Sequence, residues 1–400
     1  MISLAGRDIF HAWGKFVFTG LGLGLLIGVT LIMAGVYRGM VDDGKALLDN
    51  SGADLWVVQK DTLGPYAESS SLYGDLYRTV LAVSGVAEAS NVTYLTMQVH
   101  KNNQDIRSMV VGIMPHAHAG AVGWPPYLIA GRHLTRGHYE AVADIATHLK
   151  LGDIIKIRRN RYTVVGLTRR MVSSSGDPMV FIPLKDAQEA QFLKDNQAIW
   201  QSRHRTESNT PFSPNTVYEP DKLTDSQFSN HLVNAILVRI KPHTSADEVA
   251  ESIRRWKHLT VYTRVQMENI LIGKLIATSA KQISMFLVIL AVVSAAIVAF
   301  IIYTLTMDKI REIAVLKLIG TRNRTIAAMI LQQALALGVI GFAVGKITAT
   351  FAAPLFPKYV LLIPTDSLIG FFAVLTICAL ASVIAIRIAL QVDPAEAIGG

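Results

Sequence analysis

The sequence predicts a membrane protein with four transmembrane helices, one before and three after a large α+β domain inserted between the first and second. Four uncharged apolar runs carry this prediction: Phe16–Tyr37, Gln282–Met307, Thr325–Gly345 and Ser367–Ile386. A helix rises about 1.5 Å per residue, so a run of about 20 residues crosses a hydrocarbon core roughly 30 Å thick. The long polar stretch between the first two runs is the inserted domain.

Composition agrees with this class. The chain is 51% apolar and 17% charged, with a formal net charge of +8. In membrane proteins, basic residues concentrate in cytoplasmic loops, and no basic stretch here is interleaved with aromatic residues as single-stranded nucleic acid requires. We therefore expect no nucleic-acid partner. Cys378 is the sole cysteine. An intrachain disulfide is therefore impossible, and the inserted domain depends on its own core.

The distribution of Lys and Arg predicts the orientation. Eight basic residues lie in the two termini and in residues 308–324: Arg7, Lys15, Lys309, Arg311, Lys317, Arg322, Arg324 and Arg387. Residues 346–366 carry only Lys346 and Lys358. The positive-inside rule then places both termini and residues 308–324 in the cytoplasm. Residues 38–281 and the short loop 346–366 lie on the outer side.

The first apolar run, residues 16–37, is expected to be a retained anchor, because it is too long for a signal-peptide core and lacks a cleavage site. Residues 1–15 form either a short interfacial helix or a polar leader. Gly20, Gly24 and Gly28 give the first helix a small-residue face. Such a face allows close helix packing, and we expect the contact between two copies to include it; the alternative is the ordinary glycine enrichment of membrane helices.

The inserted domain, residues 38–281, begins and ends with helical composition, at Arg38–Asn50 and Gln266–Lys281, which predicts stalk helices. Inside it, strands are predicted at Ala53–Gln59, Val86–His100, Asp105–Ile113, Val233–Ile240 and Leu259–Arg264, and helices at Leu72–Ser84 and Ser245–Lys257. The strand–helix–strand order at both ends predicts an α+β lobe whose halves meet in space.

The middle of the domain differs in character. Short strands are expected at Leu151–Ile157, Tyr162–Leu167 and Met179–Pro183, which predicts a small β-rich subdomain over about residues 127–190. Residues 199–229 are polar and lack apolar periodicity. They are expected to form a mobile surface loop or to order on a partner.

Signals for chemistry are weak. His116 and His118 could face one side of a strand, but no third metal ligand is evident nearby. Ser173–Asp177 lacks the G-x-S-x-G pattern of a nucleophile elbow and indicates a turn. The four predicted spans hold no ionisable residue near the membrane midplane, where an ion-driven transporter needs one. We therefore expect no catalytic, metal or cofactor site on this chain.

The loop after the second membrane helix, residues 308–324, is the most informative short segment. Strong helix formers run up to Gly320, where a left-handed terminal residue is expected. A short amphipathic helix would present Arg311, Glu312 and Lys317 to the cytoplasm, with Arg322 just beyond its end. The alternative is a basic topogenic loop that binds nothing. The many apolar residues between the capping signals favour a docking helix.

The same segment carries a family resemblance. REIAVLKLIGTRNRTI resembles the "REIgiLKAlGas" signature of MacB-like/FtsX-like ABC transporter permeases, and VDPAEAI near the C-terminus resembles their "DPAEAL" tail. GADLWVV, SGVAEAS, LKLGDIIKI with YTVVGL, and VFIPLKDAQ are similar to the family's periplasmic core pattern. The similarity extends over nearly the whole chain, in the expected order.

This resemblance implies a homodimeric permease of the bacterial inner membrane, driven by a separate cytoplasmic ATPase. It also implies that residues 308–324 form a coupling helix that sits in a groove of the ATPase. The expected interface residues are Arg311, Glu312, Lys317, Gly320, Arg322, Asp393 and Glu396.

MacB itself carries a fused N-terminal ATPase domain, whereas here 15 residues precede the first span and no G-x-x-x-x-G-K-[ST] motif occurs. ATP and magnesium are therefore expected on the partner subunit. The expected function is ATP-driven export or efflux of a substrate from the periplasm or inner membrane, with a periplasmic adaptor and an outer-membrane channel as further partners. An FtsX-type permease that activates an envelope hydrolase and a LolC-type lipoprotein-releasing permease are alternatives. The cargo stays open.

Overall fold

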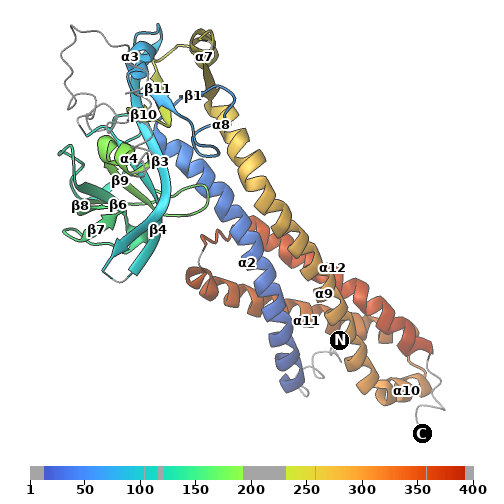
Figure 1. The fold of residues 1–400 in the computed structure, drawn as a ribbon. Coiled ribbons are helices and arrows are strands. Elements are labelled where there is room, and N and C mark those ends of the chain that lie inside the picture. Colours follow the sequence, from blue (N-terminus) through green and yellow to red (C-terminus); the bar gives the residue numbers. More distant parts are fainter. Residues whose placement is uncertain are drawn as a thin grey trace, which may run out of the picture. The chain divides into compact units, whose positions relative to one another are not determined.

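The fold is described by a computed structural model over residues 13–102, 104–115, 120–191, 231–256, 258–356 and 358–391. The chain forms two compact units (Figure 1). We call Met1–Met40 with Thr278–Gly400 the helical unit, and Val41–Ala277 the core unit. His116, His118, the predicted loop 199–229 and residues 1–12 lie outside the described residues.

Four helices are long and apolar enough to cross a membrane, which confirms the predicted one-plus-three arrangement. They are α2 (Trp13–Ser51), α9 (Ala277–Asp308), α11 (Asn323–Ala352) and α12 (Pro364–Gln391). The short helix α10 (Ile310–Leu318) joins α9 to α11. Apolar side chains of α2, α9, α10, α11 and α12 share one buried cluster, which is the core of the helical unit.

The helix that contains the third predicted span runs past Gly345, where the span was predicted to end. Helix α11 continues to Ala352, and a 3-10 turn, η3 (Ala353–Leu355), follows. Lys346 lies inside this helix, and its Nζ donates a hydrogen bond to Ser367 Oγ of α12 at 2.5 Å. The ammonium group thus has a polar partner inside the unit, and the connecting loop is shorter than residues 346–366.

The core unit is built on a ten-stranded sheet. Its strand order is β12 (Leu259–Thr263), β1 (Leu55–Gln59), β11 (Ala235–Ile240), β3 (Val86–Lys101), β4 (Gln104–Ile113), β9 (Met179–Pro183), β6 (Glu140–Asp144), β8 (Asn160–Thr168) and β5 (Leu128–Gly131), with β7 (Ile154–Ile157) paired to β3 and β8. Because β1 lies between β11 and β12, the two ends of the domain meet in space, as predicted. Helices α3 (Leu76–Leu81) and α7 (Ala246–Arg254) bury apolar side chains against this part of the sheet.

The long strand β3 belongs to two parts of the sheet. Its first half pairs with β11, and its second half, from Thr93 on, pairs with β4. From there the pairing runs through β9, β6, β8 and β7 and returns to β3 at His100 and Lys156. Six strands thus form a closed ring, and apolar residues from all six, including Val99, Val110 and Ile155, fill one buried cluster. The predicted β-rich insert is therefore not a separate subdomain, since it closes on β3 and β4.

Two local predictions in the core unit are wrong. Residues 72–84 are not one helix: β2 (Leu72–Tyr73) pairs with β10 (Leu232–Val233), and α3 covers only the later part. The strand predicted at Val233–Ile240 is interrupted at Asn234. Its amide donates to Ser70 O at 2.8 Å and accepts from Tyr94 N at 2.9 Å, so its side chain replaces strand pairing.

The remaining helices flank the sheet. Helix α4 (Leu184–Gln191) follows β9, and a 3-10 turn, η1 (Ile145–Thr147), follows β6. After β12 the chain forms α8 (Arg264–Ile270) and then a six-residue π-helix, η2 (Leu271–Ile276), before α9 begins. Ser245 occupies the N-cap position of α7 without a side-chain capping bond.

Candidate functional site

Helix α10 has two distinct faces. Ile313 and Ala314 are each 2% exposed and pack into the helical unit, whereas Val315, Leu318 and Ile319 are 46%, 64% and 76% exposed. At 3.6 residues per turn, the exposed Arg311 and Glu312 lie on the same side as these three apolar residues. The outer face of α10 is thus an apolar strip flanked by charge, a composition typical of a docking helix.

Lys317 does not belong to this outer face. Its side chain is half-buried, and its Nζ donates a hydrogen bond to the carbonyl oxygen of Leu390 in the last turn of α12 at 2.8 Å. The prediction that Lys317 is offered to the cytoplasm with Arg311 and Glu312 is therefore corrected. A cation at a helix C-terminus satisfies an orphan carbonyl and complements the helix dipole, so Lys317 joins α10 to α12.

The end of α10 confirms the left-handed conformation predicted for Gly320. Its φ is +88°, in the left-handed region. Gly320 N–H donates to Lys317 O and Thr321 N–H donates to Leu316 O, both at 3.0 Å, which is the hydrogen-bond pair of a Schellman motif. Arg322 is exposed and takes the extended N-cap position of α11. Asp393 and Glu396 lie outside the described residues.

The glycine face of α2 packs within the chain. A Cβ added to Gly24 would lie 2.6 Å from Val344 Cγ1, and one on Gly28 would lie 3.1 Å from Gly345 O, both in α11. A Cβ on Gly20 would meet Ile340 of the same helix at 2.9 Å. The face therefore allows close packing, as predicted, but α11 occupies it, so it is not available to a second copy.

A second close contact on α2 was not predicted. Leu361 N–H donates to Gly35 O at 3.0 Å, and a Cβ on Gly39 would lie 1.9 Å from Tyr359 O. Only glycine permits this approach of the α11–α12 loop to the helix. The sequence contains a signal for this contact, because Gly35 and Gly39 are four residues apart, the same spacing that separates Gly20, Gly24 and Gly28.

The helical unit buries few polar side chains. Within the described residues of the helical unit, the buried polar side chains are those of Ser294, Thr306, Gln333 and Ser382, and none of these carries a charge; Asp43, on the part of α2 that belongs to the core unit, is also buried. Buried charge in a membrane span is the usual mark of an ion or proton pathway. Among the described residues of the helical unit, no charged side chain is buried.

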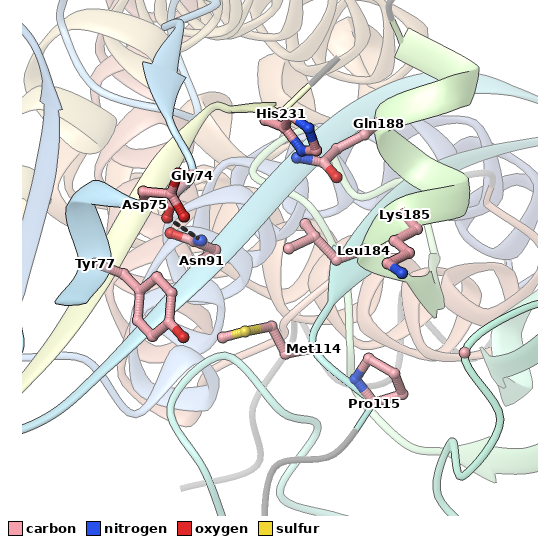
Figure 2. Close-up of a pocket in the computed structure, with 11 residues that line it drawn as sticks. Gly74, Asp75, Tyr77, Asn91, Met114, Pro115, Leu184, Lys185, Gln188 and His231 are labelled. Atoms are coloured by element: carbon pink, nitrogen blue, oxygen red, sulfur yellow. Dashed lines mark hydrogen bonds between the residues drawn. The ribbon is translucent and has the colours of Figure 1, made fainter. Parts of the chain in front are cut away.

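The core unit contains a cavity of about 470 Å³ (Figure 2). Asn91 of β3 lies at its base, Tyr77, Met114 and Leu184 supply apolar surface, and Lys185 and His231 lie at its edge. The Asn91 amide donates to Gly74 O at 2.7 Å, which fixes its orientation. This lining suits an amphipathic molecule, and no group of three metal-ligating residues occurs among the residues that the structure describes.

Two buried carboxylates of the core unit have structural roles. Glu140 accepts hydrogen bonds from the Arg132 guanidinium and from the N–H groups of Thr135 and Arg136. These contacts, the Arg132 guanidinium first among them, lower the pKa of Glu140 to about 2. Burial instead raises the pKa of Asp144, which accepts from Met171 N and Ala146 N. Both carboxylates accept hydrogen bonds from backbone N–H groups of neighbouring loops, so they fix the conformation of these loops.

Comparisons with known proteins agree with this architecture. The MacB-like periplasmic core domain family matches residues 16–256, and the FtsX-like permease C-terminal family matches residues 284–394. An uncharacterized ABC transporter permease of Mycobacterium tuberculosis is 24% identical over the full length of both chains. The putative hemin transport system permease protein HrtB of Staphylococcus haemolyticus is 22% identical and matches all of this chain and 99% of its own.

Among solved structures, the periplasmic region of MacB from Actinobacillus actinomycetemcomitans matches 57% of this chain and 99% of its own at 12% identity, with a TM-score of 0.35. The family matches together include the core unit, the helical unit and α10. They make this chain a multi-pass protein of the bacterial inner membrane and a permease subunit of an ABC transporter, which implies an ATPase partner. The chain belongs to the MacB-like/FtsX-like family of ABC transporter permeases.

Proposed function

We propose that this permease relays the ATP-driven motion of a separate cytoplasmic ATPase subunit to its core unit, for export or efflux of a substrate from the periplasm or inner membrane. The observation that carries the proposal is the outer face of α10. Val315, Leu318 and Ile319 are three exposed apolar side chains within five residues at the end of α10, an arrangement that is expected where a partner covers them.

The contacts of α10 with its own chain support a relay. Ile313 belongs to the buried cluster of the helical unit, Ala314 is buried, and Lys317 binds the end of α12. A force applied to the outer face would therefore move α12 as well as α10. Because α10 lies between two spans, the orientation predicted from Lys and Arg places it on the ATPase side of the membrane.

The proposal includes a second copy of this chain and places its contact away from the glycine face of α2. The second span supports a contact with another copy, because only 11% of its most apolar stretch is buried within the chain. Lipid or a second copy must cover the rest. We place the core unit in the periplasm, where an adaptor protein and an outer-membrane channel would receive the cargo.

Co-purification with the ATPase subunit tests the proposal. Leu318→Asp and the pair Arg311→Ala, Glu312→Ala are expected to insert normally but to lose the ATPase and export. Arg324→Ala, which removes a charge at an exposed position of α11 outside the predicted interface, is the control. Retention of the ATPase by Leu318→Asp and by the double variant would refute the docking role of α10.

A further inference from the structure

The hairpin of β7 and β8 carries four exposed cations at its tip. They are Lys156, Arg158, Arg159 and Arg161. Ile157 pairs directly with Asn160, so Arg158 and Arg159 form a two-residue turn. We call residues 154–161 the basic hairpin.

No acid neutralises these cations among the residues that the structure describes. Asp153 is bound to Lys101 and to Lys150 N–H, and Asp105 is bound to His100. Glu189 accepts a hydrogen bond from Asn160 at 3.3 Å but forms no ion pair with the hairpin within those residues. Asp153 and Asp105 are thus engaged outside the hairpin, and Glu189 contacts the hairpin only through the uncharged Asn160. The four cations therefore have no ion-pair partner among the described residues.

The arrangement is unfavourable for the folded domain itself. Lys156 and Arg161 are directly opposite each other on the two strands, and like charges in that position destabilise a sheet. Arg158 has φ +51°, in the left-handed region that glycine or asparagine normally occupies in such a turn. Residues whose charge or backbone conformation lowers the stability of the fold are expected mainly at functional sites.

The chemistry of the hairpin suits phosphate. Three of the four cations are arginines, whose planar guanidinium binds phosphate oxygens in pairs. Ile154, on the same outward face as Lys156, is 60% exposed. Exposed apolar side chains beside Lys and Arg are typical of surfaces that bind anionic membranes. A carboxylate-rich protein would match the charge but would not explain Ile154.

We propose that the basic hairpin binds the phosphate headgroups of anionic lipids at a membrane surface. This interaction is separate from the coupling role of α10 and needs neither ATP nor the ATPase. The short two-stranded frame fixes the spacing of the cations, because β7 is paired to β8 on one side and to β3 on the other.

Vesicle flotation tests the proposal with the full chain held in nanodiscs of phosphatidylcholine. The wild-type chain is expected to float with vesicles that contain phosphatidylglycerol and not with vesicles of phosphatidylcholine alone, and salt should weaken the binding. Arg158→Gln with Arg159→Gln should lower binding by about fivefold per cation removed. Lys241→Gln with Arg255→Gln removes the same charge from exposed positions elsewhere in the core unit and should have little effect.

The variant Lys156→Glu distinguishes a loss of lipid binding from a loss of folding. It converts the opposed cations into an ion pair with Arg161, so it should raise the unfolding temperature of the core unit while it lowers binding to phosphatidylglycerol. Loss of binding with unchanged or higher stability would support the proposal. The proposal would be overturned if the wild-type protein did not bind vesicles that contain phosphatidylglycerol, a result that would point to an acidic protein partner. Equal binding of the hairpin variants and the control variant would overturn it as well.

Discussion

The guanidinium of Arg38 binds the carboxylate of Asp366 through two hydrogen bonds, from Nε to Oδ2 at 2.9 Å and from Nη2 to Oδ1 at 3.0 Å. Arg38 follows the apolar run of α2, and Asp366 lies in the first turn of α12. A carboxylate at that position also complements the helix dipole. The pair therefore connects the first and last spans of the helical unit at the same end as the Tyr359–Gly39 contact.

We expect this ion pair to couple α2 and α12 by about 1 kcal/mol, because it is bidentate but its arginine side chain is 48% exposed. Arg38→Gln and Asp366→Asn should each lower the apparent unfolding temperature in detergent, and the double variant should lose no more than either single variant. Arg387→Gln, an exposed residue of α12 outside this pair, is the control. Additive losses in the double variant would show that the two side chains do not act together.

The location of the four spans follows from the sequence because uninterrupted apolar length is a local property. Their partners do not follow. Gly20, Gly24 and Gly28 predict close packing on one face, but the pattern is the same whether the neighbouring helix is α11 or a helix of a second copy. Lys346 interrupts the apolar run in the sequence, and its polar partner, Ser367, lies twenty-one residues later, so the local sequence does not reveal this contact.

The packing of α2 on α11 predicts a graded response to added methyl groups. Gly24→Ala should be the most damaging, by about 1–3 kcal/mol, since its Cβ would lie 2.7 Å from Val344 Cβ and 3.1 Å from Gly341 O. Gly20→Ala should cost less, because the nearest obstacle is the Ile340 Cγ2 methyl. Gly22→Ala should be neutral, because nothing lies within 4 Å.

Thermal stability of the three variants in detergent, measured by size-exclusion chromatography after heating, checks this order. Equal stability of Gly24→Ala and Gly22→Ala would contradict the packing of α2 against α11. A change in oligomeric state for Gly24→Ala without a loss of stability would instead return the glycine face to an interface between copies.

The closed ring of strands in the core unit could not be predicted from the sequence, because it too depends on contacts between distant segments. Alternation of apolar residues predicts strands but not which strands pair, and two pairs that close the ring, β4 with β9 and β3 with β7, join segments far apart in the chain. At residues 72–84 local helix propensity was outweighed by pairing of β2 with β10. The left-handed end of α10 at Gly320 was predicted, because a helix-capping signal depends on neighbouring residues alone. The position of Lys317 was not, because its partner Leu390 lies 73 residues later in the chain.

Glu140 predicts a pH dependence of core-unit stability. Its pKa is about 2 in the folded protein, below the ordinary value of 4.5. The carboxylate therefore stabilises the fold fully above pH 4.5, and this contribution is lost as pH falls from about 4.5 through 2. Arg132→Gln should remove about 2 kcal/mol at pH 7, a value reduced because Arg132 is half-exposed.

Apparent unfolding temperatures of wild type and Arg132→Gln, measured from pH 7 to pH 3, test this. The difference should be constant between pH 7 and about pH 5 and should shrink at lower pH, because Glu140 is then protonated in the unfolded state while the folded wild type still holds it ionised. Arg107→Gln is the control, because it removes a guanidinium that contacts Asp177 at an exposed position. It should leave the pH dependence of the unfolding temperature unchanged. A difference that grows on acidification would refute the assignment.

The left-handed glycine at the end of α10 gives the last prediction, which rests on the proposed docking role of that helix. Nothing lies within 4 Å of a Cβ added to Gly320, so a substitution there has a purely conformational cost. At φ +88°, Gly320→Ala should cost about 1 kcal/mol, whereas Gly320→Asn should cost less because asparagine tolerates the left-handed region. The strain is relieved when the last turn of α10 unwinds, and this turn carries Leu318 of the outer face. Affinity for the ATPase subunit should therefore fall by about fivefold for alanine and by less for asparagine. Gly137→Ala, which meets nothing within 4 Å and lacks a positive φ, is the control. Equal affinity of the wild type and the alanine variant would show that the capped end of α10 does not shape the docking face.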